Sequence, residues 1–185
     1  MRLIDEILEP YAELEASVQQ LMAQLIGETC GMCTACCCRA DICEEVNESA
    51  FLSLLLDHQE LSPDNMDDRY GWLDLHGCSL EYGRPPICYA YFCDELLARL
   101  PNDESRFAIQ TLGRLINHIG QNTLGDWHLV EIMNKEDLEK VDPDPLQQRL
   151  EEAQTAFEVI EEYTQTGRLS ATGHKILSSI STDDP

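Results

Sequence analysis

Basic residues are scarce in this chain, since 12 Lys and Arg stand against 35 Asp and Glu, and the formal net charge is −23. Nucleic acids and anionic membrane surfaces attract proteins through clustered Lys and Arg, whereas here the basic residues are scattered singly between Arg2 and Lys175. The charge therefore argues against nucleic-acid binding and against a membrane partner. A basic protein partner, or no macromolecular partner at all, fits such a surface better.

Long apolar runs are also missing. No stretch is apolar for long enough to cross a bilayer, and the first residues, MRLIDEILEPYAELEASVQQ, lack the cationic start, apolar run and cleavage site of a secretion signal. These features predict a cytoplasmic protein. In that reducing compartment, the nine cysteines are better explained as metal ligands or redox groups than as disulfides.

The remaining composition suits one folded domain. With 185 residues, of which 43% are apolar, the chain can bury a substantial core, which excludes disorder and a scaffold held by disulfides alone. Apolar residues recur every three or four positions in residues 1–27, 104–119 and 144–167, so each stretch predicts a helix. The first helix is either continuous or divided near Pro10.

We therefore expect a mainly α-helical single domain over residues 1–185. Flanking helices at 1–27 and 144–167 would enclose an irregular, cysteine-rich metal-binding centre over residues 30–93. The last long helix is expected to begin with Asp144 as its cap and Pro145 at its first position, and to end at Gly167. A brief strand is expected at residues 127–132, and the polar tail at 168–185 is expected to be loosely ordered.

Two groups of cysteines have the spacing of metal ligands. The first group lies in CGMCTACCCRADIC and consists of Cys30, Cys33, Cys36 and Cys37. Two cysteines separated by two residues can bind one ion, because the turn between them brings both sulfurs to the same side. The second group lies in GCSLEYGRPPICYAYFC and consists of Cys78, Cys88 and Cys93. Metal coordination stabilises more than the closure of the intervening loop costs in entropy, so we expect the chain to fold back and join the groups.

The number of thiolates fits more than one kind of metal centre. Two tetrahedral zinc ions that share one thiolate need seven sulfur ligands, whereas a cubane iron–sulfur cluster needs four and leaves three. Ligation by sulfur alone excludes magnesium and calcium and leaves zinc, iron–sulfur and cuprous copper. Among these metals we expect zinc or iron, including an iron–sulfur cluster, as the cofactor, and cuprous copper stays open on this argument.

These residues resemble a known family, the cysteine-cluster (CxxCxxCC) proteins described as zinc- or iron-chelating domains. The first group aligns with the family's run of cysteines, and the second signature is matched by Gly77, Cys78, Arg84, Pro85, Cys88 and Cys93. The resemblance covers about residues 30 to 93. It implies a metal centre held by the seven cysteines of the two groups.

The chain departs from the family pattern at three positions around the ligands. Thr34 stands where glycine is common, Tyr89 where arginine is frequent, and Phe92 where proline is usual. No ligand is lost, but a basic residue that would offset thiolate charge is absent. We expect the guanidinium of Arg84 to donate to the thiolates instead.

Three hypotheses of function follow. The first is a metal-binding protein whose centre has a structural, metal-handling or electron-transfer role. The second is a metal-dependent enzyme related to protein lysine N-methylases, because longer family members, including a flagellin lysine methylase, carry a similar cysteine module, although this chain has no recognisable nucleotide or methyl-donor motif. The third is a metal-organised adaptor for a basic protein. Cys38, Cys43 and His76 are not assigned as ligands, and Cys43 is interpreted as a buried small hydrophobe.

Overall fold

Helices make up most of the chain in a computed structural model that describes residues 2–31, 40–74 and 77–181. The helices longer than one turn are α1 (Arg2–Gly31), α2 (Ala40–Glu48), α3 (Ala50–His58), α5 (Asp94–Arg99), α6 (Asp103–Gly120), α8 (Pro143–Thr166) and α9 (Ala171–Ser181). Single turns are η1 (Pro63–Asn65), α4 (Ile87–Ala90), η2 (Leu129–Glu131) and α7 (Lys135–Leu138). The strands β1 (Leu73–Asp74) and β2 (Gly77–Cys78) form one short antiparallel pair. The expectation of a mainly α-helical single domain is confirmed.

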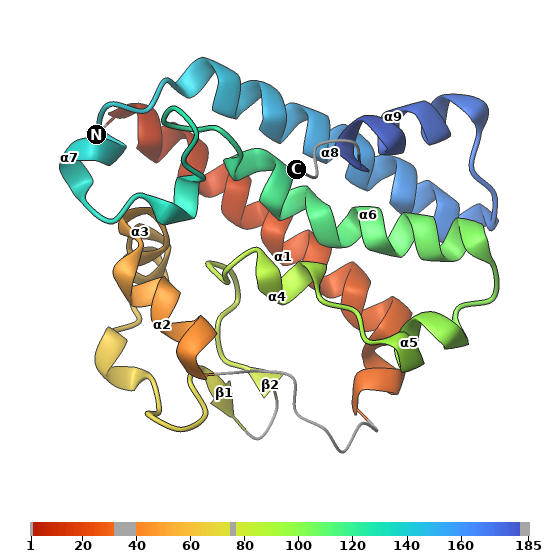
Figure 1. The fold of residues 1–185 in the computed structure, drawn as a ribbon, viewed down its shortest axis with the longest axis horizontal. Coiled ribbons are helices and arrows are strands. Elements are labelled where there is room, and N and C mark those ends of the chain that lie inside the picture. Colours follow the sequence, from red (N-terminus) through yellow and green to blue (C-terminus); the bar gives the residue numbers. More distant parts are fainter. Residues whose placement is uncertain (1, 32–39, 75–76, 182–185) are drawn as a thin grey trace.

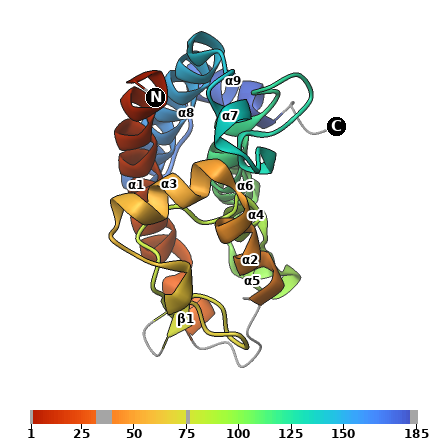
Figure 2. The same cartoon turned by 90° about the vertical axis from the view of Figure 1, so that its left-hand side faces the viewer.

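The long helices α1, α6 and α8 pack against one another and form the body of the molecule (Figure 1). α9 packs on α6 and α8, α4 packs on α6, and α5 contacts the lower part of α1. The strand pair, α2 and α5 lie at the lower end of the molecule in both ribbon views (Figure 2). Within the described part of the chain, no helix combines the length and the apolar character needed to cross a membrane.

α6 shows why the apolar repeat predicts a helix at this position. Its side chains at three- and four-residue steps are fully buried, among them Leu112, Leu115, Ile116 and Ile119. Burial of each such side chain contributes about 1.5–3 kcal/mol. The helix begins after Asn102, whose side chain accepts a hydrogen bond from the amide of Ser105 at 2.8 Å. The helix expected at 104–119 is therefore confirmed.

α8 is also confirmed, but its first turn lies two residues earlier than expected. Asp142 is the cap, because its carboxylate accepts a hydrogen bond from the amide of Asp144 at 3.1 Å, and Pro143 occupies the first turn. The sequence repeats Asp-Pro at 142–145, so the pattern of a cap followed by proline fits two registers. The helix ends at Gly167 as expected, where φ is 69° and the amide donates to the carbonyl of Tyr163.

Three other expectations need correction. α1 is continuous through Pro10, which is one of the two expected alternatives, but it extends past the expected end at Gly27 to Gly31. The strand expected at residues 127–132 is wrong, since this segment contains the 3-10 turn η2, whose Leu129 is buried. The segment is rich in apolar residues, but the buried ones, Leu129 and Ile132, stand three residues apart, which suits a 3-10 turn rather than the alternation of a strand.

The loosely ordered tail expected at 168–185 is also wrong for the residues that form α9. Leu177 is fully buried, Ile180 is 4% exposed, and a Cβ on Gly173 would lie 2.9 Å from Val159 on α8. Close packing at this glycine lets α9 lie against α8. A few apolar residues among many polar ones thus suffice to dock the segment.

The observed cap of α8 gives a test of its register. Asp142→Ala removes the side-chain acceptor of the Asp144 amide and should destabilise the protein by about 1 kcal/mol. Asp144→Ala removes the same charge from the first turn but no capping bond, so it should cost less. Chemical denaturation of both variants measures the difference, and an equal or larger loss for Asp144→Ala would contradict the register.

Candidate metal centre

The structure describes part of the expected ligand set. The backbone of Cys30 forms the last turn of α1, while Cys33, Cys36, Cys37, Cys38 and His76 lie outside the described residues. Cys78 ends β2, Cys88 lies in α4, and Cys93 is the residue that precedes α5. Among residues 2–31, 40–74 and 77–181, no three or more His, Cys, Asp or Glu side chains are placed to hold a metal ion.

Three of the elements that carry cysteines lie toward one end of the molecule, whereas α4, which carries Cys88, packs on α6 nearer the middle (Figure 1). The C-terminal end of α1, the strand pair and α5 all lie in the lower part of the molecule in both views (Figures 1 and 2). α1 also contacts α5 directly. The chain positions of Cys30, Cys78 and Cys93, although far apart in sequence, therefore belong to the same end of the fold.

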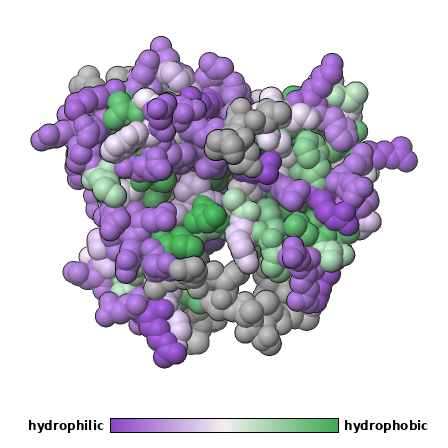
Figure 3. Space-filling model, viewed as in Figure 1, coloured by the Kyte–Doolittle hydropathy of each residue, from purple (hydrophilic) through white to green (hydrophobic). Residues whose placement is uncertain are grey.

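The described cysteines of the second group are accessible. Cys78 is half-buried against the core, whereas Cys88 and Cys93 are exposed, and Cys78 and Cys93 are free thiols. Ile87 and Tyr91, on either side of Cys88, are 47% and 59% exposed. In the view of Figure 1, the surface is mostly hydrophilic, and hydrophobic residues gather near its centre and on its right-hand side (Figure 3).

Cys43 lies closer to this group than its isolated place in the sequence suggested. Burial raises the pKa of its thiol, a hydrogen bond from the backbone of Trp72 lowers the pKa, and the neighbouring Cys78 raises it. Cys43 also packs against the apolar core. The interpretation as a buried small hydrophobe holds only in part, because Cys43 is partly exposed and is also an electrostatic neighbour of Cys78.

A buried carboxylate fixes the loop between Cys78 and Cys88. Glu15, in the middle of α1, has no exposed surface and accepts hydrogen bonds from the amides of Gly83 at 2.7 Å and Arg84 at 2.9 Å. The phenol of Tyr89 donates a third bond to the same carboxylate. Three donors thus converge on one carboxylate, and the loop is held against α1 on both sides of Cys88.

Two glutamine side chains bind the same loop. Gln19, one turn after Glu15, donates to the carbonyl of Glu81 at 2.6 Å and to the phenol of Tyr89 at 2.8 Å. Gln59, which follows α3, accepts from the amide of Glu81 at 3.0 Å and donates to the carbonyl of Tyr82 at 3.0 Å. The polar backbone of the loop is therefore paired by side chains from α1 and from the end of α3.

Burial dominates the electrostatics of this cluster. It raises the pKa of Glu15 above its usual value, and the hydrogen bonds from Tyr89, Gly83 and Arg84 and the charge of Arg84 only partly oppose this. Burial and the nearby Glu15 likewise raise the pKa of Tyr89 and Tyr11 well above the usual tyrosine value. Tyr89 therefore stays a protonated donor at neutral pH.

Arg84, Tyr89 and Phe92 fix the chain around Cys88. The Nε and Nη2 atoms of Arg84 donate to the carbonyl of Leu80 at 3.3 and 2.8 Å, so the described bonds of this guanidinium hold the loop rather than a thiolate. Tyr89 is 2% exposed. A Cβ on Gly113 of α6 would lie 2.5 Å from the carbonyl of Tyr89 and 2.7 Å from the ring of Phe92. Tyr89 and Phe92 thus dock the segment from Cys88 to Cys93 closely on α6.

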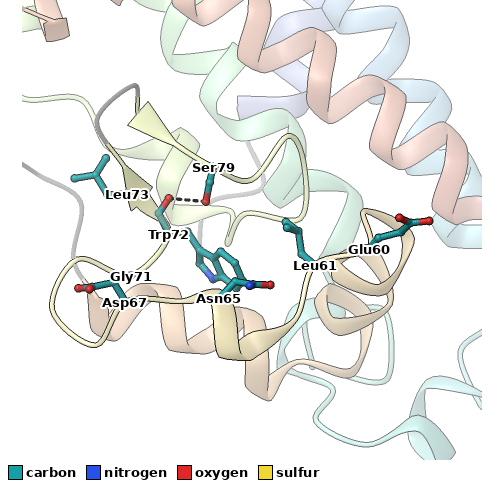
Figure 4. A pocket seen from close by; sticks show the side chains of 8 residues that line it. All are labelled: Glu60, Leu61, Asn65, Asp67, Gly71, Trp72, Leu73 and Ser79. Atoms are coloured by element: carbon teal, nitrogen blue, oxygen red, sulfur yellow. Dashed lines mark hydrogen bonds between the residues drawn. The ribbon is translucent and has the colours of Figure 1, made fainter.

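A pocket of about 610 Å³ adjoins the strand pair (Figure 4) and is lined by Glu60, Leu61, Asn65, Asp67, Gly71, Trp72, Leu73 and Ser79. The hydroxyl of Ser79 donates to the carbonyl of Trp72 at 2.9 Å. The Trp72 side chain is 2% exposed, and its Nε1 has no hydrogen-bond partner among the described residues. Because the indole is covered, it offers no stacking surface to a ligand, and the pocket does not suggest a binding site.

Sequence reasoning missed the role of Glu15. The available signal was its position, because Glu15 falls within the apolar repeat of α1, next to Leu14 and four residues after Tyr11, which are both buried. A carboxylate on a buried helix face requires donors. The repeat alone, however, does not say that those donors come from a loop near residue 83.

The raised pKa of Glu15 predicts a pH dependence of stability. The native state retains the proton in a pH range in which the unfolded state has lost it, so stability falls as pH rises from about 4.3 through the native pKa. Glu15→Gln removes this contribution. Denaturant unfolding of both proteins between about pH 4 and 8 should show the wild type losing stability relative to the variant as pH rises. Parallel profiles would contradict the assignment.

Comparisons with known proteins identify no relative of this chain. No protein-family model matches the chain, and neither a curated protein nor a solved structure matches it.

Proposed function

We propose that this protein binds zinc or iron, including iron in an iron–sulfur cluster, through the thiolates of its two cysteine groups. The proposed ligands are Cys30, Cys33, Cys36, Cys37, Cys78, Cys88 and Cys93. The centre has a structural, metal-handling or electron-transfer role. The observation that carries the proposal is the spacing of the first group, whose two-residue gaps suit chelation of one ion by neighbouring thiolates.

The described residues support this choice of metal through their chemistry. Cys78 and Cys93 are free thiols, and Cys88 and Cys93 are exposed. Soft sulfur donors favour zinc, cuprous copper and iron–sulfur centres over magnesium and calcium. The elements that carry Cys30, Cys78 and Cys93 also lie at one end of the molecule (Figure 1). These features fit a centre assembled from both groups.

The protein's own residues would shape such a centre in two ways. The hydrogen bonds of Glu15, Gln19 and Gln59 keep the loop between Cys78 and Cys88 in one conformation. Docking of Tyr89 and Phe92 on Gly113 fixes the segment from Cys88 to Cys93 against α6. The bound metal would supply a crosslink between segments distant in sequence and, if it is iron, a redox centre.

Elemental analysis of protein purified without oxygen tests the proposal. The wild type should contain zinc or iron, and Cys33→Ser and Cys88→Ser should each lower both the metal content and the melting temperature, because metal binding is coupled to folding. Tyr91→Phe is the control, since it changes an exposed residue between Cys88 and Cys93 and keeps every sulfur. Unchanged metal content in both cysteine variants would refute the ligand assignment.

The visible absorption spectrum of the same preparation separates the two metals. Iron bound by thiolates should give a brown protein with thiolate-to-iron absorbance, while zinc should give a colourless one because its d shell is filled. A colourless preparation that contains zinc would reject an electron-transfer role.

A further inference from the structure

We infer that the imidazole of His128 is an acid-sensitive latch, whose protonation releases the turn η2 from the C-terminal end of α6. In the closed state, the neutral ring holds η2 on the helix through two hydrogen bonds. In the open state, the protonated ring has lost one of them and the turn separates from α6. This inference does not depend on metal binding.

His128 joins two elements through the two nitrogen atoms of its ring. Its Nε2 atom lies 2.9 Å from the carbonyl oxygen of Asn117 in the last turn of α6, and its Nδ1 atom lies 3.2 Å from the amide nitrogen of Val130 in η2. Carbonyls in the last turn of a helix and amides in the first turn lack partners within the helix. One side chain therefore caps the end of α6 and the start of η2 together.

Only one protonation state of the ring makes both bonds. A carbonyl oxygen can only accept, so Nε2 carries a hydrogen, and a backbone amide can only donate, so Nδ1 carries a lone pair. The imidazole in the closed state is therefore the neutral Nε2–H tautomer. A proton taken from solvent binds the lone pair of Nδ1 and faces the N–H of Val130, so the cap of η2 is lost.

The ring packs directly against the backbone of α6, and the turn continues to α3. A Cβ on Gly120, the last residue of α6, would overlap the imidazole, so glycine lets the ring approach the end of the helix. The backbone amide of His128 donates to the carboxylate of Glu131 at 2.8 Å. The carbonyl of Ile132 accepts from the amide of Ala50, the first residue of α3, at 2.8 Å. η2 is thus the link between α6 and α3.

The surroundings of the ring favour the neutral form in the closed state. Burial lowers the pKa of His128 below its usual value, and the positive charge of Arg149 on α8 acts in the same direction. The hydrogen bond to Asn117 and the charge of Glu131 on η2 raise the pKa and only partly offset this. The ring therefore takes up a proton more readily in the open state, and acid favours opening.

The other ionisable groups on the helices around η2 make separate contacts or lie farther away. His118 of α6 pairs its Nε2 with the carboxylate of Glu152 on α8 at 2.9 Å. The ionisable residues of α3, Asp57 and His58, are its last two, whereas η2 contacts its first residue. A pH effect at η2 is therefore distinguishable from one between α6 and α8 by following the amides of η2.

Opening would create an apolar surface in one short segment. Leu129 and Ile132 are buried in the closed state, while Trp127 and Met133, which flank them in sequence, are 53% and 65% exposed. Release of the turn adds the two buried side chains to the two that are already exposed.

Hydrogen exchange followed by NMR on the full chain tests the inference. Protection of the amides of Val130 and Ala50 should fall by up to about tenfold per pH unit below about pH 6.5, because the open state binds one proton more than the closed state. The nitrogen chemical shifts of the His128 ring at neutral pH should show the Nε2–H tautomer.

His128→Asn separates titration from capping. Asparagine does not titrate, and its side-chain oxygen can accept from the Val130 amide as a helix cap does, so protection in this variant should not depend on pH in the same range. His174→Asn is the matched control, since it removes a partly exposed histidine from α9 and leaves η2 unchanged. Its acid response should equal that of the wild type.

Several results would overturn the latch. Protection at Val130 and Ala50 that is independent of pH in the wild type would do so, as would the Nδ1–H tautomer. A pH response that persists in His128→Asn would assign the effect to another group, and an equal loss of protection throughout α8 would assign it to global unfolding. The wild-type measurements decide the question if His128→Asn does not fold.

Discussion

The buried carboxylate of Glu15 determines how the irregular part of this protein is attached to its helices. A loop without regular secondary structure must still pair its backbone amides and carbonyls. Here the amides of Gly83 and Arg84 find their acceptor in a side chain of α1, and the phenol of Tyr89 joins them. Without this acceptor, the loop would leave the amides of Gly83 and Arg84 unpaired, and of the described loop contacts on α1 only those of Gln19 would remain.

Both cysteine groups are connected to the same helix, α1. α1 carries Glu15 near its middle and Cys30 in its last turn, so the anchor of the second group and the start of the first belong to one continuous element. α6 contributes from the other side, where Gly113 admits the backbone of Tyr89 and the ring of Phe92. In the proposed metal centre, folding of the helices would therefore prepare part of the site before metal binds.

The sequence predicted the elements whose stability comes from a regular apolar face. The spacing of their buried residues predicts α6 and α8. The end of α8 at Gly167 is predictable because glycine readily adopts the left-handed conformation found there. The first turn of α8 was displaced because Asp142-Pro143 and Asp144-Pro145 are equivalent signals locally. α9 and η2 were missed because few apolar residues dock them. The Glu15 cluster was missed for a deeper reason, since its partners lie near residue 83 and only the tertiary structure brings them together.

X-ray absorption spectroscopy tests most directly whether sulfur atoms of the two cysteine groups bind a shared metal centre. We expect the metal in the purified protein to have a shell of sulfur neighbours, at about 2.3 Å if it is zinc, and to lose sulfur neighbours in Cys88→Ser. A shell made of nitrogen and oxygen, or a sulfur shell that is unchanged in this variant, would contradict shared coordination by the two groups.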